Sequence, residues 1–87
     1  MTAWDDLWSG TALAQLAKLS PAAQGQVEAT VQQICRDPGA VGRAVGGDGA
    51  TGRTLYAARA GLIVVLYQID EIGEMVHILR LDDWSTP

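Results

Sequence analysis

Two arginines in the C-terminal half of this 87-residue chain are of a type and spacing that suit chemistry on an anion. Arg59 and Arg80 each stand in an apolar, strand-like stretch. Guanidinium groups that share one face of a sheet can bind a carboxylate or a phosphate through charge-assisted hydrogen bonds. Alternatively, both side chains lay their methylene stems over apolar surface and keep that surface soluble. The sequence leaves both interpretations open.

Three other features could carry chemistry, and each has a plainer explanation. Residues 47–54, GDGATGRT, differ from a phosphate-binding loop by Arg53 in place of lysine. Such a loop needs a strand before it and a helix after it, but the preceding RAVG is a poor strand and the following RTLYAAR leads into a hairpin. His77 is the only histidine, and no nucleophilic or acidic residue lies at a sequence spacing typical of a catalytic partner. We therefore expect a histidine packed in the core near Tyr67. Cys35 is the only cysteine, which excludes an internal disulfide and a multi-thiolate zinc site. We expect no metal and no cofactor.

The composition is that of a small globular protein with an acidic surface. Ten acidic and six basic residues give a net charge of −4. This charge disfavours binding to the phosphates of nucleic acid, which usually requires a basic surface. The N-terminus, MTAWDDLWSG, lacks a basic region, and no apolar run approaches the ~20 residues that span a bilayer. We expect one soluble, cytoplasmic domain over residues 1–87, without a membrane association.

Hydrophobic spacing and turn residues predict the element order β-α-α-β-β-β. Residues 39–52 hold six glycines and are expected to form a loop. The fold class is α+β, with a helical hairpin packed on one face of a small antiparallel sheet. The expected elements are a strand over 3–9, a helix capped by Thr11 that ends at Leu19, a helix from Pro21 to Arg36 capped by Ser20, and strands over 53–59, 62–70 and 74–81.

The hairpin loops set the two faces of the predicted sheet. The predicted loops are a two-residue loop at Ala60-Gly61 and a three-residue loop at 71–73 in which Gly73 is left-handed. With these loops, one face is uncharged apart from His77 and should lie under the helices. The other face is expected to be open, and it is mostly aliphatic: Leu55, Ala57, Arg59, Leu62, Val64, Leu66, Gln68, Val76, Ile78 and Arg80. Soluble monomers rarely expose a large contiguous apolar patch to solvent. We therefore expect a partner at Leu62, Val64, Leu66 and Ile78, and at Trp84 if that side chain is exposed rather than packed.

Two long stretches resemble the RelE/ParE toxin superfamily of type II toxin–antitoxin systems. They are KLSPAAQGQVEATVQQICRDP and LYAARAGLIVVLYQIDEIGEMVHILRL. The family pattern of tyrosine, arginine, glycine, tyrosine, isoleucine and aspartate is filled by Tyr56, Arg59, Gly61, Tyr67, Ile69 and Asp70. The resemblance implies a small growth-inhibiting toxin held inactive by an antitoxin segment that wraps it. RelE-like members cleave messenger RNA on the ribosome, and ParE-like members inhibit gyrase.

The chain departs from the ribonuclease members of that family on the open face. Val64 stands where the family places a strand arginine, Ala57 stands where it places a lysine, and Asp82 and Asp83 follow the last strand in place of a basic stretch. Phosphate cleavage needs cations to stabilise the charge that develops in the transition state. A nuclease of this sequence would rely on Arg59, Arg80 and Arg53.

We therefore predict a toxin-fold protein of a toxin–antitoxin-type module that acts by protein binding on the open face. The expected partner is a cognate antitoxin or a second copy of the chain. A ribosome-dependent messenger RNA endoribonuclease with an atypical arginine set is one alternative, and a non-toxic relative that serves as a binding module is another.

Overall fold

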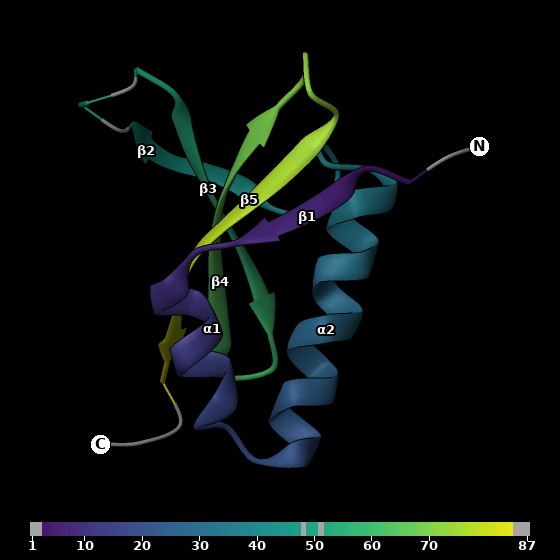
Figure 1. Cartoon of the computed structure of the whole chain (residues 1–87), viewed down its shortest axis with the longest axis vertical. Coiled ribbons are helices and arrows are strands. Elements are labelled where there is room, and N and C mark those ends of the chain that lie inside the picture. The colour runs from purple at the N-terminus through teal and green to yellow at the C-terminus, as the bar shows by residue number, and fades with distance from the viewer. Residues whose placement is uncertain (1–2, 48, 51, 85–87) are drawn as a thin grey trace.

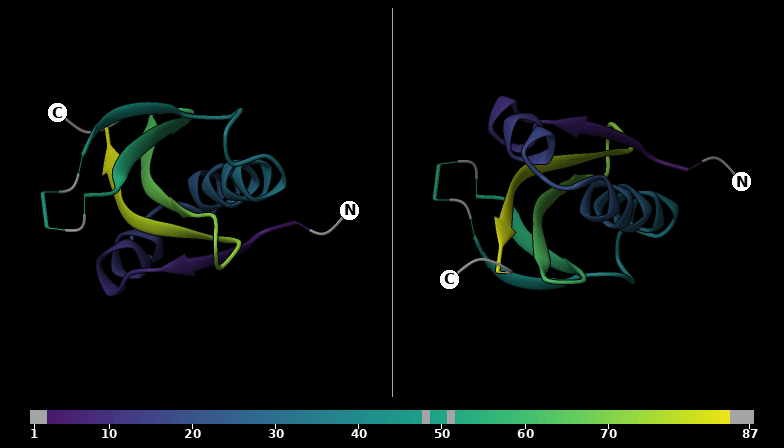
Figure 2. Two further views of the ribbon diagram at one scale, coloured as in Figure 1. Left: turned by 90° about the horizontal axis from the view of Figure 1, so that it is seen from above. Right: turned by 90° about the horizontal axis from the view of Figure 1, so that it is seen from below.

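The computed structural model describes residues 3–47, 49–50 and 52–84. Two helices lie on one face of a five-stranded sheet with the order β1-β5-β4-β3-β2 (Figures 1 and 2). The predicted α+β class is confirmed, and the structure adds a strand, β2, and a parallel pairing of β1 with β5. The elements are β1 (Asp5–Trp8), α1 (Gly10–Ala17), α2 (Pro21–Arg36), β2 (Arg43–Gly47), β3 (Thr54–Ala60), β4 (Ile63–Asp70) and β5 (Met75–Asp83).

Serine caps fix the start of both helices. The predicted cap of α2 is confirmed: the Ser20 hydroxyl accepts the Ala23 amide at 3.2 Å, and Pro21 takes the first helical position. Helix α1 begins earlier than predicted, because Ser9 and not Thr11 is its cap. The Ser9 hydroxyl also donates to the backbone carbonyl of Leu79 at 2.6 Å, so the cap ties α1 to β5.

The glycine-rich segment is not entirely a loop. Arg43–Gly47 pair with β3 as strand β2, so the prediction of a loop over 39–52 is wrong for these residues. Gly42, just before this strand, passes directly over the Tyr67 hydroxyl. A Cβ at Gly42 would overlap the hydroxyl oxygen and would lie 2.7 Å from the Ala57 carbonyl oxygen. Glycine is therefore required at position 42, because the backbone passes too close to the Tyr67 side chain to leave room for a Cβ.

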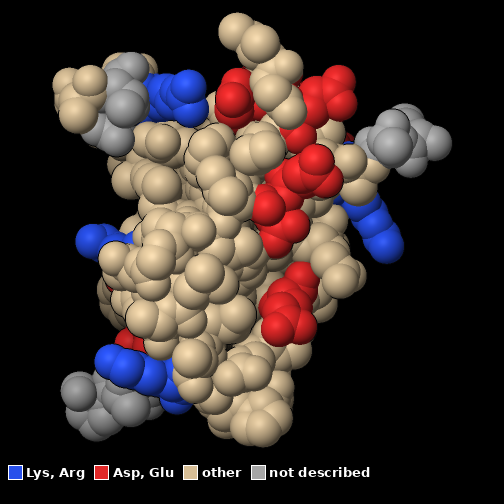
Figure 3. All heavy atoms as spheres, in the orientation of Figure 1, with Lys and Arg blue, Asp and Glu red and all other residues tan. Residues whose placement is uncertain are grey.

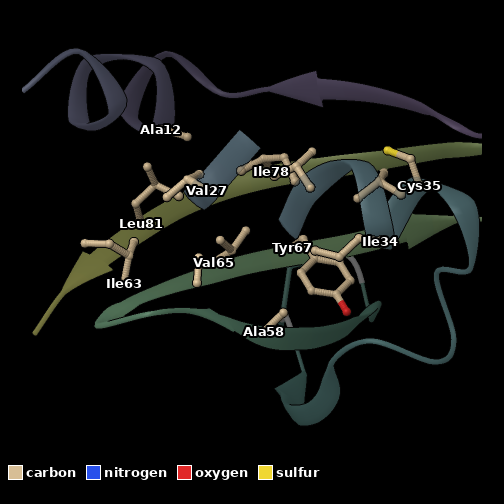
Figure 4. Close-up of a cluster of buried hydrophobic side chains, with 13 residues drawn as sticks. Ala12, Val27, Ile34, Cys35, Ala58, Ile63, Val65, Tyr67, Ile78 and Leu81 are labelled. Carbon is tan, nitrogen blue, oxygen red and sulfur yellow. The ribbon is translucent and has the colours of Figure 1, made fainter. Parts of the chain in front are cut away.

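The core lies between the two helices and the covered face of the sheet (Figure 4). Tyr67 is fully buried and stacks on Tyr56 with ring centroids 5.6 Å apart. The core takes its side chains from α1, α2 and the three middle strands. The buried hydrophobic residues are Ala12, Val27, Val31, Ile34, Cys35, Ala58, Ala60, Ile63, Val65, Tyr67, Val76, Ile78 and Leu81.

The β3–β4 hairpin preserves the predicted faces despite a different turn. Ala60 pairs with Ile63, so the turn is Gly61-Leu62, and Gly61 adopts the left-handed conformation at φ 64°. The pairing is shifted by two residues from the predicted one. Because side chains alternate with a period of two, this even shift leaves every β3 and β4 residue on the face expected for it.

The β4–β5 hairpin reverses the predicted faces over the first half of β5. Asp70 pairs with Met75, so the turn has four residues, and Glu74 rather than Gly73 takes the left-handed conformation. This one-residue slip turns Val76 and Ile78 toward the helices. The predicted place of Ile78 on the open face is therefore wrong, because its side chain is fully buried in the core.

The same slip moves His77 to the open face, opposite Gln68, so its predicted place under the helices is also wrong. A β-bulge at Leu79 then adds one residue to β5, since Tyr67 pairs with Ile78 and Leu66 with Arg80. After the bulge, Arg80 lies on the open face as expected. The bulge corrects the register that the turn displaced.

Candidate partner-binding face

The sheet face that points away from the helices carries most of the predicted site residues. Two rows of paired residues cross β3, β4 and β5 on this face. Arg59, Val64 and Asp82 form one row, and Ala57, Leu66 and Arg80 form the next. The structure thus places Val64 at the centre of a cross-strand row, with a cation on one side and a carboxylate on the other.

An exposed apolar cluster lies at the end of this face, where β3 turns into β4. Leu62, Val64 and Trp84, here called the apolar patch, line a depression of about 460 Å³ with Arg59 on its rim. The exposed fractions of Leu62 and Trp84 are 55% and 73%. The Trp84 amide donates to the Leu62 carbonyl at 2.9 Å, which holds the tryptophan backbone beside the turn. Trp84 is therefore displayed to solvent, unlike Trp4 and Trp8, which pack against the core.

Leu66 contributes less surface than predicted. Its side chain is 8% exposed, and it lies beside Leu55, Leu79 and Arg80, which share with it a shallow depression of about 150 Å³. The bulge places Leu79 beside Leu66 in this depression. A partner on this face would touch Val64 before it touched Leu66.

The three arginines named from the sequence are not brought together. Arg80 Nε lies 3.2 Å from Asp82 Oδ1 in an exposed ion pair, and Arg59 faces Val64 across the strands. Arg53 precedes β3, six residues before Arg59, which separates them by about 20 Å along an extended chain.

The titratable groups with displaced pKa values lie in the core and not on the open face. Burial, followed by the nearby charges of Asp6 and Asp5, raises the pKa of the Cys35 thiol from 9.0 to about 11, which makes it unreactive. Burial also raises the pKa of Tyr67, and the Gly42 backbone amide opposes this rise without forming a hydrogen bond of good geometry. Tyr67, a residue of the family pattern, is therefore a structural side chain.

The described part of the chain shows neither a metal cluster nor a membrane span. Within residues 3–47, 49–50 and 52–84, no three His, Cys, Asp or Glu side chains gather as metal ligands. None of the helices in these ranges is long and apolar enough to cross a bilayer.

Comparisons with known proteins give matches at the level of structure. No protein-family model matches the chain, and no curated protein matches it. A chain of the toxin–antitoxin complex RelBE2 from Mycobacterium tuberculosis superimposes with a TM-score of 0.82 at 29% identity, over 99% of this chain and 97% of that one. A chain of the RelE–RelB complex from Pyrococcus horikoshii gives 0.80 at 18% identity, over 99% and 100%. The YoeB/ParE toxin from Agrobacterium tumefaciens gives 0.71 at 11% identity, over 91% and 96%.

These matches extend over nearly the whole chain and define its class as a small toxin fold of two helices on one sheet. The fold is that of the RelE/ParE-like toxin superfamily, as the sequence resemblance implied.

Proposed function

We propose that this protein is the toxin-fold component of a toxin–antitoxin-type module, and that it acts by binding protein through its open face. The observation that carries the proposal is the apolar patch, with Trp84 and Leu62 largely exposed around Val64. Apolar patches of this kind mark binding surfaces in soluble proteins, and tryptophan is a preferred anchor. The similar structures from M. tuberculosis and P. horikoshii are toxin–antitoxin complexes, which supports an antitoxin as the partner.

The chemistry of the patch specifies the partner segment. An aliphatic or aromatic side chain would enter the depression between Val64 and Trp84, and an acidic residue beside it would pair with Arg59 on the rim. We take this segment to belong to an antitoxin. A second copy of the chain is the other candidate, and the oligomeric state of the purified protein distinguishes the two.

Messenger RNA cleavage is the alternative activity, and the charges of the open face speak against it. Asp82 neutralises Arg80 and would repel a phosphate, and Val64 separates that pair from Arg59. The net charge of −4 gives no long-range attraction for RNA. A protein target, such as an antitoxin or gyrase, suits an apolar patch better than a phosphate backbone does.

Copurification tests the proposal. If a small reading frame abuts the gene, the chain is expressed with its product, as wild type, as Val64→Lys and as Ile72→Lys. Ile72 is the matched control, because it is 99% exposed in the β4–β5 turn, away from the patch. The partner should copurify with the wild type and with Ile72→Lys, and the Val64→Lys variant should lose it. Equal recovery with all three proteins would contradict the proposal.

A growth assay separates protein binding from RNA cleavage. The chain alone is expressed in bacteria, as wild type and as the double variant Arg59→Ala/Arg80→Ala. If expression arrests growth through protein binding, arrest should come without new RNA ends. New cleavage ends that vanish in the double variant would establish the ribonuclease and overturn the proposal.

A further inference from the structure

The β4–β5 turn carries an apolar side chain that its own chain does not cover. Ile72 lies in this turn and is 99% exposed. Turn positions favour residues such as Gly, Asn and Asp, and an isoleucine left in water adds no hydrophobic stabilisation to the fold. Asp70 Oδ1 accepts the Gly73 amide at 3.1 Å, which stabilises the turn. Ile72 therefore protrudes from a braced turn and is available to a second molecule.

The charges around Ile72 are negative. Glu71 and Glu74 flank it in the turn, and both are exposed. In the space-filling view, acidic side chains lie on both sides of an uncharged projection at the upper end of the molecule, where Figure 1 places this turn (Figure 3). The turn therefore presents an apolar tip with an acidic border.

The apolar patch has the complementary character, an apolar depression with Arg59 on its rim. Two carboxylates follow in the sequence, but neither cancels this charge. Asp82 pairs with Arg80 at 3.2 Å. Asp83 lines a separate depression with Lys18, beside helix α1. Arg59 itself forms no ion pair with any described residue, so the rim of the patch stays positive.

The turn and the patch lie at opposite ends of β4. This strand runs from Ile63, beside the patch, to Asp70, at the base of the turn, and its eight residues extend over roughly 25 Å. One chain therefore cannot fill its own patch with its own turn. Two copies with opposed open faces and antiparallel β4 strands bring each turn to the patch of the other copy. A two-fold axis relates such copies, and this is the commonest symmetry of soluble oligomers.

We infer that the chain, when no other partner is bound, forms a two-fold dimer in which each β4–β5 turn occupies the apolar patch of the other copy. Ile72 enters the depression beside Val64, and Glu71 and Glu74 face Arg59 across the interface. The inference rests on the proposed function in one respect, namely that the apolar patch binds protein. Because both use this patch, an antitoxin and a second copy exclude each other.

A charge swap between two copies tests the contact by sedimentation equilibrium of the full chain. Arg59→Glu and the turn variant Glu71→Lys/Glu74→Lys should each weaken the dimer roughly tenfold, since both exposed ion-pair contacts of the dimer become repulsive. An equimolar mixture of the two proteins should dimerise like the wild type. In the mixed dimer, one contact keeps its original charges and the other has them exchanged. A mixture that dimerises no better than its separate components would overturn the inference.

A second variant separates this inference from the proposed function. Ile72→Lys should abolish the dimer, whereas Leu13→Lys, at an exposed position of α1, should keep it. Equal loss in both variants would overturn the inference. Ile72→Lys leaves the patch intact, so an antitoxin should still copurify with it. A wild-type monomer that binds an antitoxin through Val64 would overturn this inference alone. A dimer that depends on Ile72, in a chain that binds no antitoxin, would support it and contradict only the antitoxin proposal.

Discussion

Replacing Gly42 with alanine should destabilise the protein, because this glycine lets the chain cross directly over the buried Tyr67 side chain. An added Cβ would overlap the Tyr67 hydroxyl oxygen and lie 3.0 Å from Tyr67 Cζ. It would also lie 2.7 Å from the Ala57 carbonyl oxygen, which belongs to the β3 backbone. The tyrosine ring is fully buried, so the clash can be relieved only by moving β2 away from β3.

The expected loss can be worked from these contacts. Overpacking a well-packed site lowers the free energy of unfolding by about 1–3 kcal/mol. A Gly→Ala substitution also raises it by about 0.4–1 kcal/mol, because alanine restricts the unfolded chain. We expect the free energy of unfolding to fall by about 1–1.5 kcal/mol, which corresponds to a drop in Tm of roughly 4–12 °C for a domain of this size. Gly46→Ala is the control, because a Cβ at Gly46 meets no atom within 4 Å.

A double-mutant cycle with Tyr67→Phe shows whether the hydroxyl causes the loss. The hydroxyl is buried and has no hydrogen-bond partner among the described residues, so its removal alone should change stability little or raise it. In urea unfolding followed by circular dichroism, Gly42→Ala should cost about 1 kcal/mol less when it is combined with Tyr67→Phe. The reasoning fails if Gly42→Ala costs no more than Gly46→Ala, or if the two substitutions at Gly42 and Tyr67 are additive.

Three smaller predictions concern the cap, the thiol and the surface ion pair. Ser9→Ala should lower the free energy of unfolding by about 1–2 kcal/mol in urea, because the α1 cap and the hydrogen bond to Leu79 are lost together. The folded protein holds the Cys35 proton to about pH 11, while the unfolded chain releases it near 9.0. Stability should therefore be lost between about pH 9 and pH 11, and Cys35→Ala should flatten this part of the measured curve. Asp82→Ala should change Tm little, since its pair with Arg80 is exposed and such pairs contribute about 0–1 kcal/mol.

The parts of the fold that local chemistry dictates could be predicted from the sequence. The cap at Ser20, the element types and the faces of β3 and β4 follow from turn residues and hydrophobic spacing. Strand β2 could not be predicted, because its glycines indicate a loop on local propensity alone. It pairs with β3 because the Gly42 backbone can approach Tyr67, a contact between residues far apart in the sequence.

The faces of β5 could not be predicted because this strand lacks a polar alternation. MVHILRL has apolar residues at both parities, so the register depended on the turn, where Glu74 rather than Gly73 is left-handed. The predicted turn therefore puts Ile78 on the open face and His77 on the covered one, the reverse of what the structure shows. Arg80 was placed correctly because the bulge at Leu79 offsets the slip in the turn. A bulge carries no local sequence signal of this kind and is found only in the folded chain.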